Sequence, residues 1–72
     1  MISKQEKKNR KELGDKLRQT REKMDFTQAE VAEKTGITVN YYAMIERGEV
    51  NPSLSKVRKL LNVLKINPSK IF

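Results

Sequence analysis

The chain lacks the two residue types that most often carry chemistry in proteins. Its 72 residues include no cysteine and no histidine. No disulfide or thiolate metal site can form without cysteine, and the commonest general base and metal ligand is missing. The three glycines do not form a phosphate-cradling loop. We therefore expect a protein that is not an enzyme and has no metal site and no cofactor.

Long hydrophobic runs are also missing. No apolar segment approaches the roughly 20 residues that a membrane span needs. The charged start MISKQEKKNRK has no apolar stretch behind it, so it does not resemble a secretory signal. These absences predict a cytoplasmic protein without a membrane partner, built as one domain close to the lower size limit for a self-sufficient core.

Acidic residues are scarce and unevenly placed. The chain has 16 Lys and Arg against 9 Asp and Glu, which gives a formal net charge of +7. Residues 1–24 and 51–72 carry the basic excess, whereas residues 25–50 contain more acidic than basic side chains. An excess of this size is typical of a protein that binds a polyanion such as nucleic acid. The alternative is a surface that is merely well solvated.

The N-terminal third of the chain predicts one helix. Residues 1–6 show no apolar spacing and are expected to form a flexible basic arm, with the domain at residues 7–72. Apolar or small side chains then recur at helical steps over residues 7–24, at Leu13, Leu17, Thr20 and Met24. Gly14 within this helix costs about 1 kcal/mol relative to Ala, and the pattern gives no reason for it.

Capping signals predict two further helices in the middle of the chain. Thr27 to Glu30 reads as a capping box, so the second helix begins at Gln28. Gly36 ends it, because glycine adopts a left-handed cap without strain. Thr38 caps a third helix that ends at Gly48.

The C-terminal part predicts a fourth helix and a last turn. Ser53 is the next cap, and an apolar stripe follows it at Leu54, Val57, Leu60, Leu61 and Leu64. Asn67 and Pro68 start the last turn, as a cap and a first helical residue. The prediction is an all-α fold, a compact bundle of five short helices around one core.

The third predicted helix has an outward face of unusual composition. Tyr42 and Ile45 face inward at 100° per residue, beside Thr38 and Tyr41. The outward arc carries small apolar, amide and thioether groups and one cation, at Val39, Asn40, Ala43, Met44 and Arg47. A face turned only to water normally carries Lys and Glu. This face suits base edges instead, because Asn pairs with adenine and methyl groups contact the thymine methyl.

The two central helices are joined by a short turn that contains glycine, as in a helix-turn-helix. The chain resembles the Cro/C1-type (XRE-type) helix-turn-helix family. The resemblance rests on the segments LRQTREKMDFTQAEVAEKTGIT, IERGEVNPSL and INPSKIF, and leaves out only about the first dozen residues. It implies the lambda-repressor-like DNA-binding fold, with the motif formed by the second and third helices.

The resemblance also implies roles for individual residues. The third helix would lie in the DNA major groove, with base-reading positions at Val39, Asn40, Ala43 and Met44. Positions that contact the DNA backbone or brace a base-reading side chain would be Thr27, Gln28, Thr38, Tyr41 and Arg47. Arg21 and Glu46 match a structural ion pair between the first and third helices. Each position also has a plainer interpretation, as a solvated or core residue.

Two positions depart from the usual family pattern. Asp25 stands where glycine is common, so it is expected to adopt a left-handed conformation, which Asp tolerates. Tyr42 stands where Ile or Val is common, so its hydroxyl needs space and a hydrogen-bond partner.

Together these features predict a sequence-specific regulator of transcription that binds double-stranded DNA, with repression by operator occupancy as the commoner family outcome. A homodimer would read an inverted-repeat operator, because two symmetric half-sites match a two-fold protein. Dimer contacts are expected at Ile66, Ile71 and Phe72, which could instead close the core. Two alternatives involve other partners: an antitoxin or other regulator that binds a protein, and a restriction–modification controller protein.

Overall fold

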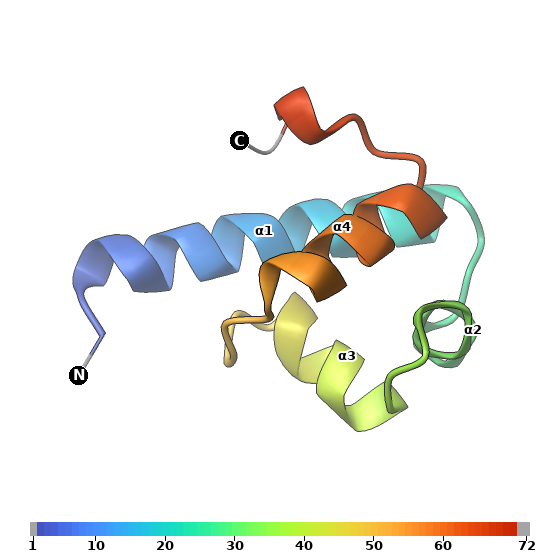
Figure 1. Cartoon of the computed structure of the whole chain (residues 1–72), viewed down its shortest axis with the longest axis horizontal. Coiled ribbons are helices and arrows are strands. Elements are labelled where there is room, and N and C mark those ends of the chain that lie inside the picture. The colour runs from blue at the N-terminus through green and yellow to red at the C-terminus, as the bar shows by residue number, and fades with distance from the viewer. Residues whose placement is uncertain (1, 71–72) are drawn as a thin grey trace.

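The computed structural model describes residues 2–70, which form four α-helices and one 3₁₀ turn (Figure 1). The elements are α1 (Lys4–Lys23), α2 (Gln28–Thr35), α3 (Val39–Glu46), α4 (Leu54–Val63) and η1 (Pro68–Lys70). The all-helical prediction is confirmed. The fifth helix is not confirmed, because the described residues after Asn67 form only a three-residue 3₁₀ turn, a form that short helical segments often take.

The first helix begins at Lys4, earlier than the predicted start at Lys7. The Ser3 hydroxyl caps it by accepting a hydrogen bond from the Glu6 backbone N–H at 3.1 Å. Residues 4–6 of the segment predicted to be an arm are therefore helical. Apolar spacing could not show this start, because residues 3–9 are all exposed and α1 extends past the other helices at this end (Figure 1).

One hydrophobic core holds the four helices together. α2 packs against α3 and α4, and α1 packs against α3. The buried apolar side chains are Leu17, Val31, Ala32, Tyr42, Ile45, Val57, Leu60, Leu61, Leu64 and Ile66. Full burial of a Leu, Ile or Val side chain contributes about 1.5–3 kcal/mol. Thr20 on the inner side of α1 satisfies its hydroxyl by donating to the Lys16 carbonyl at 2.9 Å.

Gly14 marks a close approach of α1 to the end of α3. A Cβ atom at Gly14 would lie 2.6 Å from the Ile45 carbonyl oxygen and would meet the Glu46 carbonyl oxygen as well. Only a residue without a side chain lets the two backbones approach this closely. The contact explains a glycine that its own helix does not favour.

Two non-glycine residues of the described chain have left-handed backbones. Asp25 has φ 59°, as predicted, in the turn after α1. Lys65 has φ 55° and directly follows the last residues of α4. Glycine is the usual residue at such a helix end because the conformation crowds any Cβ atom.

Lys65→Gly is expected to stabilise the protein by about 0.5 kcal/mol, because the relief of left-handed strain exceeds the added freedom of the unfolded chain. Thermal or urea unfolding of the two proteins measures the difference. Lys59→Gly, inside α4, is the matched control and is expected to cost about 1 kcal/mol. A Lys65→Gly protein as destabilised as this control would show that the end of α4 carries no strain.

Candidate nucleic-acid interface

The turn between α2 and α3 has the geometry of a helix-turn-helix. Three residues, 36–38, separate the helices. Gly36 has φ 73°, and the Ile37 N–H donates to the Ala32 carbonyl at 3.0 Å. The Thr38 hydroxyl then accepts from the Tyr41 N–H at 3.1 Å and starts α3. The predicted motif is therefore present, with its helices at the predicted positions.

The third helix buries one face and exposes the other. Tyr42, Ile45 and Glu46 are buried. The predicted base-reading residues lie on the opposite side: Val39 is 48% exposed, Asn40 is exposed, and Ala43 and Met44 are half-buried. The nearest described partner of the Asn40 amide nitrogen is the Met44 sulfur at 3.9 Å, a weak acceptor. The Asn40 amide is therefore free to bind an external group.

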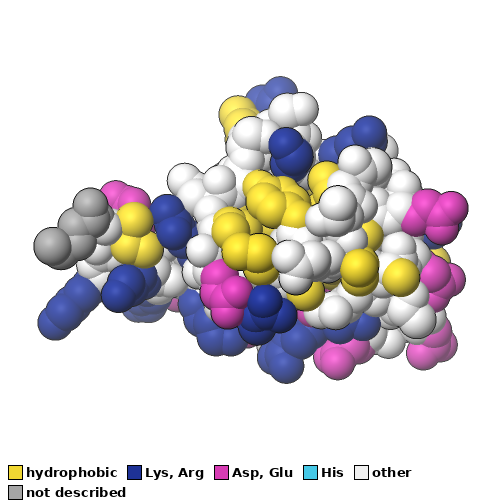
Figure 2. All heavy atoms as spheres, turned by 90° about the horizontal axis from the view of Figure 1, so that it is seen from below, with side chains coloured by type: hydrophobic (Ala, Val, Ile, Leu, Met, Phe, Trp, Pro, Cys, Tyr) yellow, Lys and Arg dark blue, Asp and Glu magenta, His cyan; other side chains and the backbone are white. Residues whose placement is uncertain are grey.

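Charge is arranged around this surface rather than on it. Figure 2 views the molecule from the side on which α2 and α3 lie in Figure 1. Hydrophobic and uncharged side chains gather in the middle of this face, while Lys and Arg side chains lie along its two long edges and acidic groups lie mostly at one end (Figure 2). Such a surface can meet bases in its centre and phosphates at its edges.

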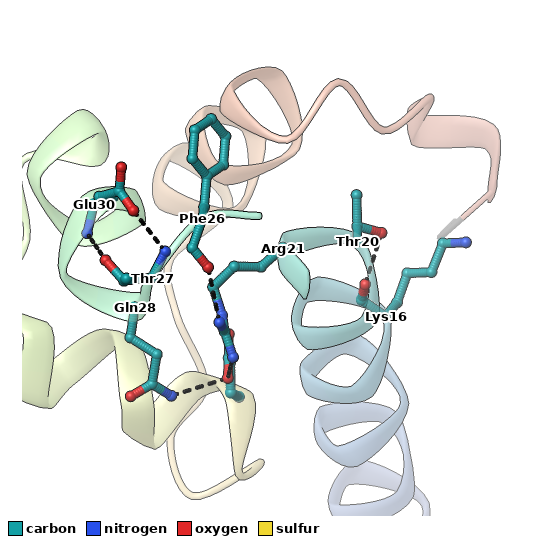
Figure 3. Close-up of polar contacts among 8 residues, drawn as sticks. Lys16, Thr20, Arg21, Phe26, Thr27, Gln28 and Glu30 are labelled. Carbon is teal, nitrogen blue, oxygen red and sulfur yellow. Dashed lines mark hydrogen bonds and ion pairs between the residues drawn. The ribbon is translucent and has the colours of Figure 1, made fainter. Parts of the chain in front are cut away.

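The side chains of Thr27 and Thr38 each cap the start of a helix and keep a hydroxyl proton free to donate. The Thr27 hydroxyl accepts from the Glu30 N–H at 3.0 Å, and the Glu30 carboxylate accepts from the Thr27 N–H at 2.8 Å (Figure 3). Thr38 caps α3 in the same way through its oxygen. Because both hydroxyls are used as acceptors, their protons remain available for an acceptor such as a phosphate oxygen.

A buried polar cluster connects α1, the start of α2 and the end of α3 (Figure 3). The Arg21 guanidinium donates to both Glu46 carboxylate oxygens, at 2.6 and 3.2 Å, and to the Phe26 carbonyl at 3.0 Å. The exposed fractions are 13% for the Arg21 side chain and 3% for that of Glu46. The structure thus forms the ion pair that the family resemblance implied.

Gln28 joins the same cluster. Its Nε2 atom donates to Glu46 Oε1 at 3.0 Å. An ionised carboxylate only accepts hydrogen bonds, so the Gln28 atom that faces it must be the amide nitrogen. The Gln28 carbonyl oxygen consequently points away from the ion pair (Figure 3). Glu46 therefore fixes which end of this amide is offered to a ligand.

The cluster also controls the protonation of Glu46. Burial by itself raises the pKa of Glu46, but the neighbouring Arg21, Tyr42 and Gln28 side chains outweigh this effect and bring it below its ordinary value. Tyr42 lies beside this carboxylate, and its buried hydroxyl has no partner of ordinary hydrogen-bond geometry among the described residues. Burial and the nearby negative charge raise the pKa of Tyr42.

Arg47 and Tyr41 have neighbours that the sequence did not reveal. Arg47 forms an exposed two-point ion pair with Glu49, with both contacts at 2.9 Å. An exposed pair of this kind adds little stability, so Arg47 can exchange Glu49 for a phosphate. Tyr41 is half-buried, and the Lys56 ammonium lies 5.8 Å from the centre of its ring. Only the packing of α4 against the motif brings Lys56 to this position.

Of the three residues predicted to form dimer contacts, the structure describes only Ile66. Ile66 is only 8% exposed and belongs to the core of the chain itself. Ile71 and Phe72 lie outside the described residues. Leu54 is instead the large hydrophobic side chain exposed on α4, at 56%, and shares a shallow hollow with Ile66 and Pro68.

Two further features of the part of the chain that the structure describes are the apolar length of its helices and the grouping of its acidic side chains. No helix among residues 2–70 is both long and apolar enough to cross a bilayer. Across the same residues, no three or more acidic side chains are grouped so that they could hold a metal ion.

Comparison with known proteins agrees with this geometry. Residues 17–71 match a family described as helix-turn-helix. The chain belongs to the Cro/C1-type helix-turn-helix family. It is 36% identical over 59 residues to the immunity repressor protein of Bacillus phage phi105, and 32% identical over 56 residues to the HTH-type transcriptional regulator SinR of Bacillus subtilis.

These helix-turn-helix relatives are longer than the chain. The aligned regions cover 82% and 76% of this chain but only 41% of the phage repressor and 50% of SinR. SinR of Bacillus licheniformis matches with the same identity and coverage as its Bacillus subtilis counterpart. The similarity therefore establishes the family of the domain, while the activity of the longer relatives bears on this chain only as a proposal.

Proposed function

We propose that this chain is a sequence-specific, double-stranded DNA-binding regulator of transcription that represses by occupying an operator. The observation that carries the proposal is the uncharged outer face of α3 within a helix-turn-helix, bordered by basic side chains (Figure 2). The names of the related proteins, an immunity repressor and an HTH-type transcriptional regulator, support it. No chemical step is required, because occupancy alone excludes competing proteins.

In this proposal α3 enters the major groove and the neighbouring elements hold the backbone. Val39, Asn40, Ala43 and Met44 read bases through one amide and several apolar contacts. The free hydroxyl protons of Thr27 and Thr38, the oriented amide of Gln28, and Tyr41 and Arg47 lie around them. These groups contact phosphates or brace the base-reading side chains, which sets the position of α3 in the groove.

We further propose that the protein binds DNA as a homodimer on an inverted repeat, in the cytoplasm. One eight-residue helix reads a short half-site, and two-fold pairing doubles the sequence that is read. The exposed Leu54 and the hollow that it shares with Ile66 and Pro68 supply an apolar surface for this pairing. Ile71 and Phe72 follow directly in the chain and remain candidates for the same contact.

Selection of bound duplexes from a random DNA pool tests the proposal. At about 150 mM salt, nonspecific attraction is well screened, so enrichment reports base recognition. We expect an enriched inverted repeat. Enrichment of a single half-site would support base reading and contradict the dimer. No enrichment, with weak binding that disappears as salt rises, would overturn the proposed function and direct the search to a protein partner.

Asn40→Ala is expected to weaken binding to the selected site by about 1–3 kcal/mol and to relax one base position, because a bidentate amide contact is lost. Titration of the selected duplex and a repeat of the selection measure the two effects. Asn9→Ala is the matched control, since Asn9 is an exposed amide on α1 that lines the hollow toward α4. Unchanged site preference in the Asn40→Ala protein would refute the base-reading assignment.

A further inference from the structure

The N-terminal half of α1 carries a row of lysines along one side. Lys4, Lys7, Lys8 and Lys11 stand at positions i, i+3, i+4 and i+7, which fall within an arc of about 100° on a helix. All four residues are exposed. We call these four residues the lysine face.

The lysine face lies on a different side of α1 from the hollow against the start of α4. The other side of this part of α1, including Glu6, Glu12 and Leu13, lines a hollow against the start of α4, and none of the four lysines lines that hollow. Lys11 instead packs its backbone on Gly48, directly beyond α3, where an added Cβ would lie 3.1 Å from the Lys11 Cα. Basic side chains of this overhanging end are visible in the view from the α3 side (Figure 2).

The lysine face is only weakly neutralised by the chain itself. Lys8 lies 4.0 Å from Glu12 and Lys11 lies 2.7 Å from Asp15, both as exposed pairs one turn apart. Lys4 and Lys7 form no ion pair with any described residue. Exposed pairs of this kind contribute about 0.3–0.5 kcal/mol, so they do not prevent the lysines from binding an external anion.

The lysine face destabilises α1, the helix that carries it. The pairs Lys4–Lys8 and Lys7–Lys11 place like charges one turn apart, which destabilises a helix. Positive charge near a helix N-terminus is unfavourable as well, because the helix dipole is positive there. A row of anions beside this face would remove both penalties.

We propose that the lysine face binds DNA phosphates outside the base pairs that α3 reads, which extends the protein's contact along one strand. The inference rests on the proposed function. Lys4 to Lys11 covers about 10 Å at 1.5 Å per residue. Phosphates of one strand are spaced about 3.4 Å apart along the duplex axis, so a helix segment of this length placed parallel to that axis would span about three of them. The contact adds affinity without adding sequence information.

The test compares two double variants of equal charge. Lys4→Gln with Lys7→Gln removes the two unpaired lysines of the lysine face. Lys16→Gln with Lys23→Gln removes two exposed lysines from the other side of α1 and is the control. Gln and Lys have similar helix propensities. Binding is measured over a range of salt, on the selected duplex with long flanks and on the same duplex trimmed to its recognised base pairs.

The lysine-face variant is expected to bind the long duplex roughly tenfold more weakly than the control variant, with a salt slope lower by up to about 1.8, since each phosphate contact contributes about 0.9. Its preference for the long duplex over the trimmed one should also be smaller than that of the wild type, because only Lys8 and Lys11 of the lysine face remain. Equal affinities and slopes for the two variants would overturn the inference and leave the proposed function intact. A wild-type protein that selects no duplex would overturn both.

Discussion

Gly14→Ala is expected to destabilise the protein by about 2–3 kcal/mol, although Ala gains about 1 kcal/mol over Gly inside a helix. The new methyl group would meet the carbonyl oxygens of Ile45 and Glu46, which belong to the backbone at the end of α3. A side chain can rotate away from such a contact, but a helix end can only move as a unit. For a domain of this size the loss corresponds to a fall in Tm of roughly 10–20 °C.

Thermal unfolding followed by circular dichroism measures this effect. Gln19→Ala is the control, because Gln19 is exposed on the same helix and its replacement reports helix propensity alone. We expect the control to match or slightly exceed the wild type. A Gly14→Ala protein with the stability of the control would show that α1 and α3 can separate at no cost.

The secondary structure was largely predictable because its signals are local. The Thr27 capping box, Gly36 and Thr38 each act on residues within one turn, so the sequence placed α2 and α3 correctly. The family resemblance supplied the pairing of Arg21 with Glu46. The predicted start of α1 was too late because it relied on hydrophobic spacing. The helix begins after the cap Ser3, and no apolar residues follow this cap closely enough to mark it.

The contacts between distant segments were not predictable from local patterns. Gly14 lies against residues some thirty positions later in the chain, and nothing near it in sequence indicates a close backbone approach. The neighbourhood of Lys56 and Tyr41 depends in the same way on how α4 crosses the motif. For Tyr42 the need of the hydroxyl for a partner was predicted, yet the described structure leaves it beside Glu46 without a hydrogen bond of ordinary geometry.

Glu46→Gln is expected to destabilise the protein by about 2–3 kcal/mol at pH 7, because it leaves the guanidinium of Arg21 without a counter-charge in a largely buried site. The pKa of Glu46 is below its ordinary value in the folded protein. The unfolded state therefore takes up the proton first as the pH falls. The stability that ionised Glu46 contributes is complete above pH 5 and is lost as the pH falls through the lowered pKa.

The difference between wild type and Glu46→Gln should therefore shrink as the pH is lowered from 7 to 3, because the wild-type carboxyl becomes neutral too. Urea unfolding at a series of pH values measures it. Asp15, Glu30 and Glu49 also have lowered pKa values, but both proteins contain them, so their contributions cancel. Glu49→Gln is the control, since its pair with Arg47 is exposed and its loss should leave stability unchanged. A Glu46→Gln deficit independent of pH would mean that the charge of Glu46 does not stabilise the cluster.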